Sequence, residues 1–344
     1  MLPPIATTTV GSFPRPSWLA ETDRSEVTFL FQGERLREAQ DDATLLVLSK
    51  QEEISLDLLT DGEQRRSQFI YHVLASLDGI DLADRRPKAI RRRTSHERLV
   101  PRVIGPIRRR TPAVVDDFRF AKTHTARRIK VSVPGPMTVV DSSYDEFYAD
   151  EAALAMDVAA ALNTELLDLQ KAGCDVVQID EPAMTRYHEK VATYGALALD
   201  RLLEGLTIPT IVHLCYGYPG GDPLQHEYEY PELLELLMQT RIGGFSLEFA
   251  RSNFDPKHLR LCGDRLVMLG CIDPGNSPLE SVDAVAARVS AALNYVEPSR
   301  LLIAPDCGLM TIDRELAYAK ARLLVEVAQK VRITLYLIKA SRQG

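Results

Sequence analysis

No apolar run in the 344-residue sequence approaches the roughly 20 residues that a bilayer-spanning helix requires. The first residues, 1–5, lack the basic and apolar regions of a signal peptide. Five cysteines are too few, and odd in number, for a disulfide framework in a chain of this length. The glycines match neither the dinucleotide-binding nor the phosphate-loop motif, so no nucleotide site is visible. We therefore expect a cytoplasmic protein with reduced cysteines.

The composition is that of an ordinary globular protein. Hydrophobic residues make up 45% of the chain and charged residues 26%, which excludes a wholly disordered, collagenous or coiled-coil chain. The length fits one large domain or two smaller ones. We expect a single domain over residues 1–344.

The net charge of −7 conceals a strongly basic segment at residues 85–130. This segment contains 16 Lys or Arg and three acidic residues, which leaves 25 basic and 45 acidic residues elsewhere. It fits a binding surface for anions or an acidic partner, and equally a hairpin whose charges are paired internally. No nucleic-acid-binding motif accompanies it, and we expect neither nucleic acid nor membrane as a partner.

Short apolar runs, each ending in Gly, Pro or a polar residue, alternate with helix-like segments such as 150–172 and 281–295. The eight runs are residues 7–10, 56–60, 129–133, 176–179, 210–214, 244–247, 266–271 and 301–304. A doubly wound sheet would also accommodate this alternation. Eight strand–helix units nevertheless favour a (β/α)₈ TIM barrel.

The segment between the second and third expected strands, residues 64–125, is too long for one crossover helix. It contains most of the basic segment. An alternating stretch at 99–107, which includes Gly105 and Pro106, indicates a protruding hairpin. We expect a basic insertion within the barrel.

Reactive side chains gather where the expected strands end. In a barrel these ends converge on one mouth, where active sites of this fold are built. The residues concerned are Ser12, Glu63, Asp180, His213, Cys215, Glu248, Asp273 and Cys307. Capping of strands by polar residues would explain Asp well, but it would not explain a histidine and a cysteine.

A metal site is the strongest chemical prediction from these positions. His213 and Cys215 are two residues apart on a strand, so both side chains face the same side. Cys307 adds a second thiolate and Glu248 a carboxylate, and this donor set suits Zn²⁺. The alternative for Glu248 is an ion pair with Arg251 at the strand end.

The motifs around these residues resemble the catalytic domain of cobalamin-independent methionine synthase and its single-domain relatives. The matching pieces are 8–14 (TTVGSFP), 62–63 (GE), 178–182 (QIDEP), 213–216 (HLCY), 246–248 (SLE) with 251–252 (RS), and 305–309 (PDCGL). They span nearly the whole chain in the order of the family.

The resemblance implies a (β/α)₈ barrel with zinc held by His213, Cys215, Glu248 and Cys307. It also implies a homocysteine site. There the amino group meets Glu63 and Asp180, and the carboxylate meets the backbone near Gly11 and Ser12. Asp273 is a further candidate, as a catalytic proton acceptor or as a support for the site.

Two positions depart from the family in a way that concerns the methyl donor. Ser142 stands where the family has a Trp thought to stack on the pterin of folate. Pro274, Gly275 and Asn276 follow Asp273, where the family has an Asp-x-His proposed to protonate the leaving folate nitrogen. Because an amine leaves poorly unless it is protonated, we expect a donor other than methylfolate, such as a methylcorrinoid or a corrinoid protein.

The leading hypothesis is therefore a zinc-dependent homocysteine methyltransferase of the methionine synthase type. The alternative is a thiol alkyltransferase resembling epoxyalkane:coenzyme M transferase, in which the basic insertion would contact a sulfonate. A metal-binding accessory protein without turnover is the weakest hypothesis, since structural zinc sites are normally closed by four ligands.

Overall fold

Eight parallel strands form a nearly closed barrel in the computed structural model, which describes residues 2–23, 26–90, 97–216, 229–252, 254–275 and 278–341. The strands are β1 (Ala6–Thr7), β4 (Leu58–Leu59), β7 (Arg128–Pro134), β9 (Val176–Asp180), β10 (Thr210–Leu214), β11 (Gly244–Glu248), β12 (Leu266–Ile272) and β13 (Leu301–Pro305). Their hydrogen-bonded order is β1-β13-β12-β11-β10-β9-β7-β4. The predicted TIM barrel is confirmed.

The gap between the end strands of this order, β1 and β4, is closed by individual hydrogen bonds. The amide of Asp57 donates to the carbonyl of Thr7 at 3.1 Å, and the Thr8 hydroxyl donates to the carbonyl of Leu58 at 2.8 Å. Both strands are shorter than the apolar runs that predicted them, and β1 begins one residue before its run. The other strands match their predictions to within one residue at each end.

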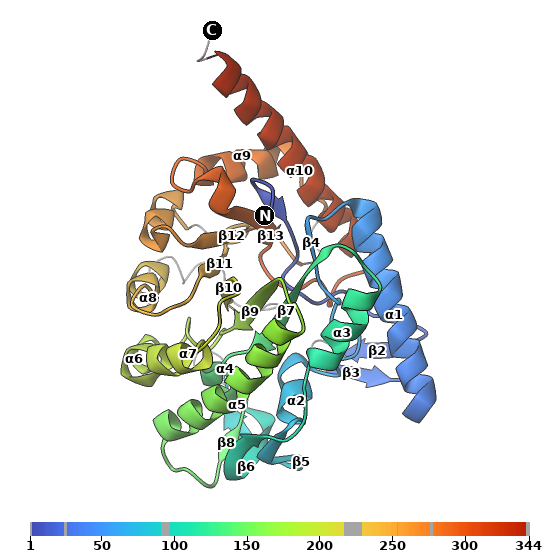
Figure 1. Cartoon of the computed structure of the whole chain (residues 1–344), viewed down its shortest axis with the longest axis vertical. Coiled ribbons are helices and arrows are strands. Elements are labelled where there is room, and N and C mark those ends of the chain that lie inside the picture. Colours follow the sequence, from blue (N-terminus) through green and yellow to red (C-terminus); the bar gives the residue numbers. More distant parts are fainter. Residues whose placement is uncertain are drawn as a thin grey trace.

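Helices surround the strands and connect them (Figure 1). They are α1 (Gly33–Ile54), α2 (Phe69–Leu74), α3 (Val115–Thr123), α4 (Pro136–Asp141), α5 (Glu151–Lys171), α6 (His188–Lys190), α7 (Ala196–Leu202), α8 (Glu229–Leu237), α9 (Val282–Ala292) and α10 (Arg314–Ser341). A π-helical turn (Val191–Gly195) and 3₁₀ turns (Pro256–Cys262, Pro298–Arg300) complete the connections. Within the described residues, no helix combines the length and apolar character needed to cross a membrane.

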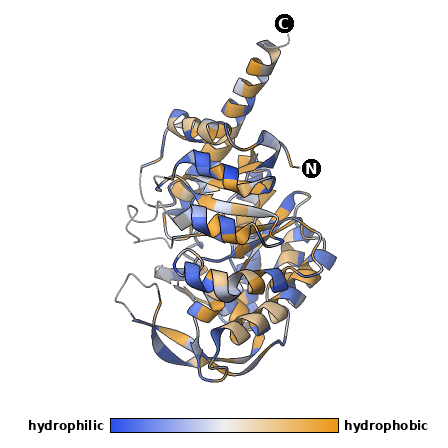
Figure 2. Cartoon of the chain, turned by 90° about the vertical axis from the view of Figure 1, so that its left-hand side faces the viewer, coloured by the Kyte–Doolittle hydropathy of each residue, from blue (hydrophilic) through white to orange (hydrophobic). Residues whose placement is uncertain are grey.

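The two-residue period of the strands divides the barrel interior into layers. Its base is apolar and is formed by Ala6, Val10, Leu58, Val176, Ile211, Met268, Leu302 and Ala304. Further along the same strands, the inward positions become polar, as at Gln178 after Val176 and His213 after Ile211. Outward positions pack under the helices, which carry both hydrophilic and hydrophobic residues in Figure 2. The barrel interior is therefore apolar at its base and polar at its mouth.

The insertion after β4 carries the expected hairpin, made of β5 (Leu77–Ala89) and β6 (Glu97–Arg109). Gly105 and Pro106 lie inside β6 and not at a turn, and the short strand β8 (Tyr144–Asp145) pairs with the other edge of β6. A second small hairpin, β2 (Ala20–Asp23) with β3 (Glu26–Phe29), precedes α1. Arg91, Arg92 and Arg93 lie outside the described residues.

Several arginines of the basic segment are paired with carboxylates. Arg102 contacts Asp81 at 2.8 Å and Glu146 at 2.7 Å. Arg109 contacts Glu165 at 2.6 Å and Asp168 at 2.7 Å. These contacts favour the self-paired interpretation of the segment for the residues concerned.

Glu165 on α5 connects the hairpin to the barrel. Its carboxylate is buried, binds Arg109, and accepts hydrogen bonds from the amides of residues 113–115 at 2.7–3.1 Å. Those amides include the start of α3, where backbone donors lack partners within the helix. One side chain therefore holds α3, α5 and β6 together.

Replacing Glu165 with Gln should lower the free energy of unfolding by about 1.5–3 kcal/mol, because buried hydrogen bonds to a charged group are lost while Arg109 keeps Asp168 as a partner. The measurement is the urea midpoint at unchanged m-value. The matched control is Glu53→Gln, which removes an exposed pair with Lys50 and should leave the midpoint where it was. Equal midpoints for the two variants would contradict this role of Glu165.

Candidate functional site

Three of the predicted metal ligands come together at the carboxyl ends of β10 and β13. The ligand atoms of His213, Cys215 and Cys307 lie within 4.8 Å of one another. The two Sγ atoms are 3.4 Å apart, and all five cysteines of the chain are thiols. Two sulfurs bound tetrahedrally to one Zn²⁺ would lie about 3.8 Å apart, so this spacing needs little adjustment.

The imidazole of His213 is held with one nitrogen toward the cluster. A hydrogen bond of 2.9 Å joins Nδ1 to Ser246 Oγ on β11, whereas the buried Nε2 has no hydrogen-bond partner among the described residues. Burial lowers the pKa of His213 to about 3, which leaves the ring neutral at physiological pH. An unpartnered, buried nitrogen lone pair beside two thiols fits a metal ion.

Glu248, the fourth predicted ligand, lies beside this cluster but is not part of it. Its Oε1 accepts a hydrogen bond from the Tyr216 amide at 3.2 Å. Burial, followed by the proximity of Cys215 and Asp306, raises the pKa of Glu248 well above its usual value. The carboxyl group stands at the end of β11, next to the strand that carries His213 and Cys215.

The loop after β11 is held by Asp306, the residue before Cys307. Its carboxylate accepts hydrogen bonds from the amides of Phe249, Ala250 and Arg251 at 2.9–3.0 Å. Burial raises the pKa of Asp306 to about 7, while these three amides oppose the rise. Asp306 thereby ties the ends of β11 and β13 together beside the cluster.

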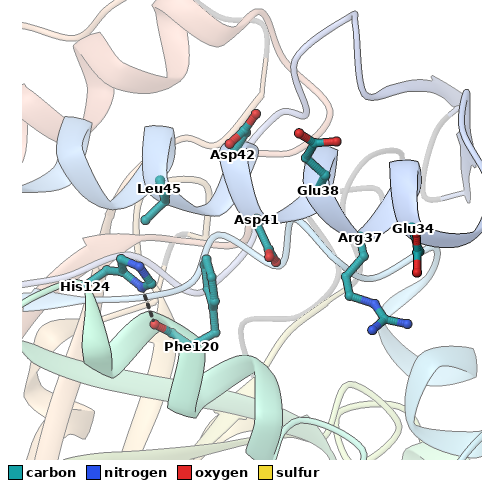
Figure 3. Close-up of a pocket in the computed structure, with 8 residues that line it drawn as sticks. All are labelled: Glu34, Arg37, Glu38, Asp41, Asp42, Leu45, Phe120 and His124. Atoms are coloured by element: carbon teal, nitrogen blue, oxygen red, sulfur yellow. Dashed lines mark hydrogen bonds between the residues drawn. The ribbon is translucent and has the colours of Figure 1, made fainter.

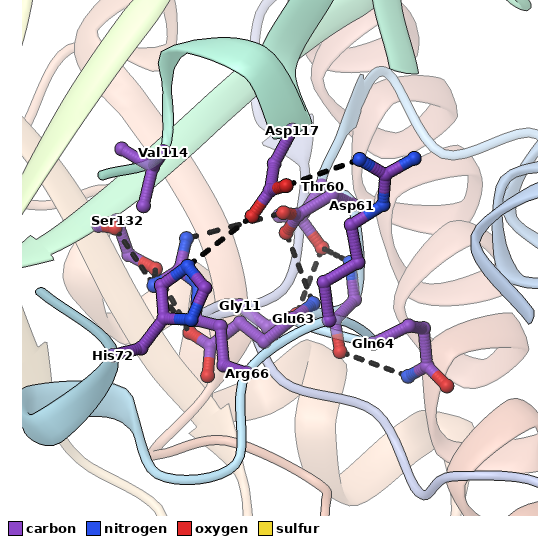
Figure 4. Close-up of polar contacts among 12 residues, drawn as sticks. Gly11, Thr60, Asp61, Glu63, Gln64, Arg66, His72, Val114, Asp117 and Ser132 are labelled. Carbon is purple, nitrogen blue, oxygen red and sulfur yellow. Dashed lines mark hydrogen bonds and ion pairs between the residues drawn. The ribbon is translucent and has the colours of Figure 1, made fainter. Parts of the chain in front are cut away.

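Glu63, the first of the two predicted ammonium ligands, has a tightly defined position (Figure 4). Ser132 Oγ donates to its Oε1 at 2.8 Å, and Arg66 lies 3.6 Å from the same oxygen. The backbone of Glu63 has φ +56°, a conformation unusual outside glycine, and Arg15 donates to its carbonyl. Buried partners therefore hold both the carboxylate and the backbone.

Asp180, the second of them, ends β9 next to His213 on β10. Gln178 Nε2 donates to its Oδ1 at 2.6 Å. Burial, and then the charge of Glu63, raises the pKa of Asp180 to about 7. The influence of Glu63 on Asp180 indicates that the two buried carboxylates lie near each other.

Gly11 and Ser12 approach both predicted parts of the site, Gly11 at Glu63 and Ser12 at the loop that follows Cys307. A Cβ on Gly11 would lie 2.7 Å from Glu63 Oε1, and one on Gly308 would lie 2.2 Å from Ser12 Oγ. The carbonyl of Ser12 also accepts a hydrogen bond from the Leu309 amide at 2.9 Å. The predicted substrate loop thus lies against the loop that carries Cys307.

Asp273 follows the end of β12, and its described hydrogen bonds do not join it to the metal cluster or to Glu63 and Asp180. Its Oδ1 accepts from the Gly275 amide at 2.8 Å, and its carbonyl accepts from Lys320 at 2.7 Å. Asn276, which belongs to the stretch that departs from the family, lies outside the described residues.

Several residues of the site were not singled out by the sequence. Ser246, Gln178 and Asp306 lie inside the motifs quoted above, without an assigned role. Lys130 was counted in the basic segment, yet it is fully buried in the barrel. Lys130 and Ser132 are two residues apart in an otherwise apolar strand, so both side chains face the same side. This spacing was the signal in the sequence that Lys130 faces the barrel interior.

An open groove of about 520 Å³ lies away from these residues, between α1 and α3 (Figure 3). It is lined by Glu34, Arg37, Glu38, Asp41, Asp42, Leu45, Phe120 and His124. None of the predicted site residues contributes to it, so it is distinct from the barrel mouth.

The chain is similar to known proteins over nearly its whole length. Residues 5–330 match the family model of the catalytic domain of cobalamin-independent synthase. The chain is 31% identical to a methionine synthase of Sulfurisphaera tokodaii, over 96% of this chain and 94% of the relative. It is 32% identical to a methionine synthase of Thermococcus kodakarensis, with the same two coverages.

A solved structure from Shewanella sp. W3-18-1, described as a B12-independent methionine synthase in complex with selenomethionine, is also similar. It is 33% identical and superimposes with a TM-score of 0.91, covering 97% of this chain and 99% of the other. The chain therefore belongs to the family of the cobalamin-independent synthase catalytic domain and is an enzyme of the methionine synthase class.

Proposed function

We propose that this protein methylates the thiol of homocysteine to give methionine, with a zinc ion and a methyl donor other than methylfolate. The observation that carries the proposal is the juxtaposition of a His-Cys-Cys cluster with the buried carboxylates of Glu63 and Asp180. The solved relative that binds selenomethionine, an analogue of the product, supports the same substrate class.

Zinc would be held by Nε2 of His213 and by the thiolates of Cys215 and Cys307. Metal binding through Nε2 requires the proton on Nδ1, which then donates to Ser246 Oγ. Glu248 is the proposed fourth ligand, and its neighbouring position would let it approach or withdraw as the substrate sulfur arrives. When bound, the metal would lower the pKa of the substrate thiol, so that the sulfur is deprotonated at neutral pH.

The remaining residues would bind and orient the amino acid. The homocysteine ammonium group would lie between Glu63 and Asp180, and its carboxylate would meet the backbone of Gly11 and Ser12. Since the Ser12 loop contacts the Cys307 loop, an amino acid held there would direct its side-chain sulfur toward the cluster. The thiolate would then attack the methyl carbon of the donor as the leaving group departs.

The proposed donor is a methylcorrinoid, free or bound to a partner protein. Ser142 ends α4 with a small, buried side chain, in place of the stacking Trp of the family. Neither Pro274 nor Gly275, the two residues after Asp273, has a side chain that can donate a proton. A cobalt leaving group needs no proton, so its departure would not require the missing histidine.

The basic insertion gives little support to the thiol alkyltransferase alternative. Arg102 and Arg109, which could have contacted a sulfonate, are already paired with carboxylates. An amino-acid substrate, in contrast, gives the Glu63 and Asp180 pair a direct role.

The first prediction concerns the metal. The purified protein should contain about one zinc per chain, and Cys215→Ser or Cys307→Ser should lose both the metal and turnover. Elemental analysis by mass spectrometry measures this directly. Cys262→Ser, a buried thiol in the 3₁₀ turn away from the cluster, is the matched control and should keep its zinc. Full occupancy in Cys307→Ser would remove Cys307 from the ligand set.

The second prediction concerns the donor. With homocysteine as acceptor, methylcobalamin should support methionine formation, whereas methylfolate should not do so at a useful rate. Mass spectrometry of the thioether product distinguishes the two. Comparable turnover with both donors would mean that another residue supplies the acid.

The third prediction concerns the ammonium pocket. Glu63→Gln or Asp180→Asn should reduce homocysteine turnover on the order of 100- to 1,000-fold, because a buried charge loses its partner, while zinc stays bound. Asp168→Asn removes a carboxylate on α5 and should retain turnover. If a plain thiol such as coenzyme M outcompetes homocysteine in the native protein, the two carboxylates are not substrate ligands.

A further inference from the structure

Lys130, on β7, crosses the barrel interior beneath the proposed ammonium pocket. Its Nζ donates to the carbonyl of Val10 at 2.7 Å and to Oε1 of Gln178. Gln178 in turn donates through Nε2 to Asp180 Oδ1. A chain of hydrogen bonds therefore leads from the backbone before Gly11 to one of the two pocket carboxylates.

The chemistry of these groups allows only one orientation of the Gln178 amide. An ammonium group only donates hydrogen bonds and a carboxylate only accepts them. With Lys130 on one side, the amide oxygen must face the lysine and the NH₂ group must face Asp180. A reversed amide would set its NH₂ against the lysine and its oxygen against the carboxylate.

Lys130 also contacts the backbone that leads into the Gly11 side of the pocket. The carbonyl it binds belongs to Val10, directly before Gly11 and Ser12. Its positive charge is buried among the negative charges of Asp180, Glu63 and Asp61, and burial lowers the pKa of Lys130 to about 8. The lysine is thus a cation at neutral pH that balances the carboxylates before an amino acid arrives.

We infer that Lys130 is a positioning residue for amino-acid recognition: by orienting Gln178 and anchoring Val10, it sets Asp180 and the Gly11 loop to receive the substrate's ammonium group. This inference rests on the proposed function. Lys130 would not touch the reacting atoms. Its contribution should therefore be confined to thiols that carry an amino group.

The test compares two thiols that differ only in that group, homocysteine and 4-mercaptobutanoate. Affinities for the metal-loaded protein are measured by calorimetry, and KM and kcat are measured where turnover occurs. In Lys130→Met, homocysteine affinity should fall roughly 10- to 100-fold, the effect expected when hydrogen bonds to charged groups are lost. The affinity for 4-mercaptobutanoate should change little, and KM should change more than kcat.

Two further variants separate positioning from folding. Gln178→Met keeps the lysine but removes the amide, and it should reproduce the selective loss. The double variant should be no worse than either single one, because both act along one chain of hydrogen bonds. Lys88→Met, which removes another lysine that donates to backbone carbonyls, is the matched control and should keep the native ratio of the two affinities.

The outcomes distinguish the inference from the proposed function. If the native protein does not prefer homocysteine to 4-mercaptobutanoate, the ammonium pocket itself is refuted, and the role of Lys130 with it. If the native protein discriminates and Lys130→Met discriminates equally well, the inference alone is overturned. Equal weakening of both thiols in Lys130→Met and Gln178→Met would likewise reduce Lys130 to a structural residue.

Discussion

Charge buried inside the barrel has to be compensated by partners from other strands, and the arrangement of the mouth depends on this requirement. Glu63 is held by Ser132 on β7 and by Arg66, which follows three residues later in the same loop. Glu181, next to Asp180, accepts hydrogen bonds from the amides at the start of α4. Each carboxylate that could serve the reaction is thus tied to an element that also belongs to the fold.

The same requirement explains why the metal cluster and the amino-acid pocket adjoin. Asp180 and His213 are neighbours on β9 and β10, so one strand pair supplies a group to each. Asp306 precedes Cys307 and fixes the loop that follows Glu248. The metal cluster and the amino-acid pocket are therefore positioned by neighbouring strands and a shared loop.

Much of this architecture could be predicted from the sequence, because it depends on local periodicity. His213 and Cys215 face one side because they are two residues apart, and the eight strands follow from short apolar runs. The partners of these residues could not be predicted in the same way. Lys130 was counted with its basic neighbours, and its buried partners became evident only from the register of β7. The contact of Glu165 with Arg109 joins elements more than 50 residues apart.

The closure of the barrel between β1 and β4 has a dynamic consequence. Ladder pairing is thin there, with two residue pairs joining β1 to β13 and two joining β4 to β7. Individual hydrogen bonds, such as that from the Thr60 hydroxyl to the carbonyl of Gly11, join the two sides of this seam between β1 and β4. Local opening costs least where few cooperative bonds must break. A ligand held by Gly11 on one side and Glu63 on the other would bridge this seam, so that occupancy of the pocket and rigidity of the barrel wall would rise together.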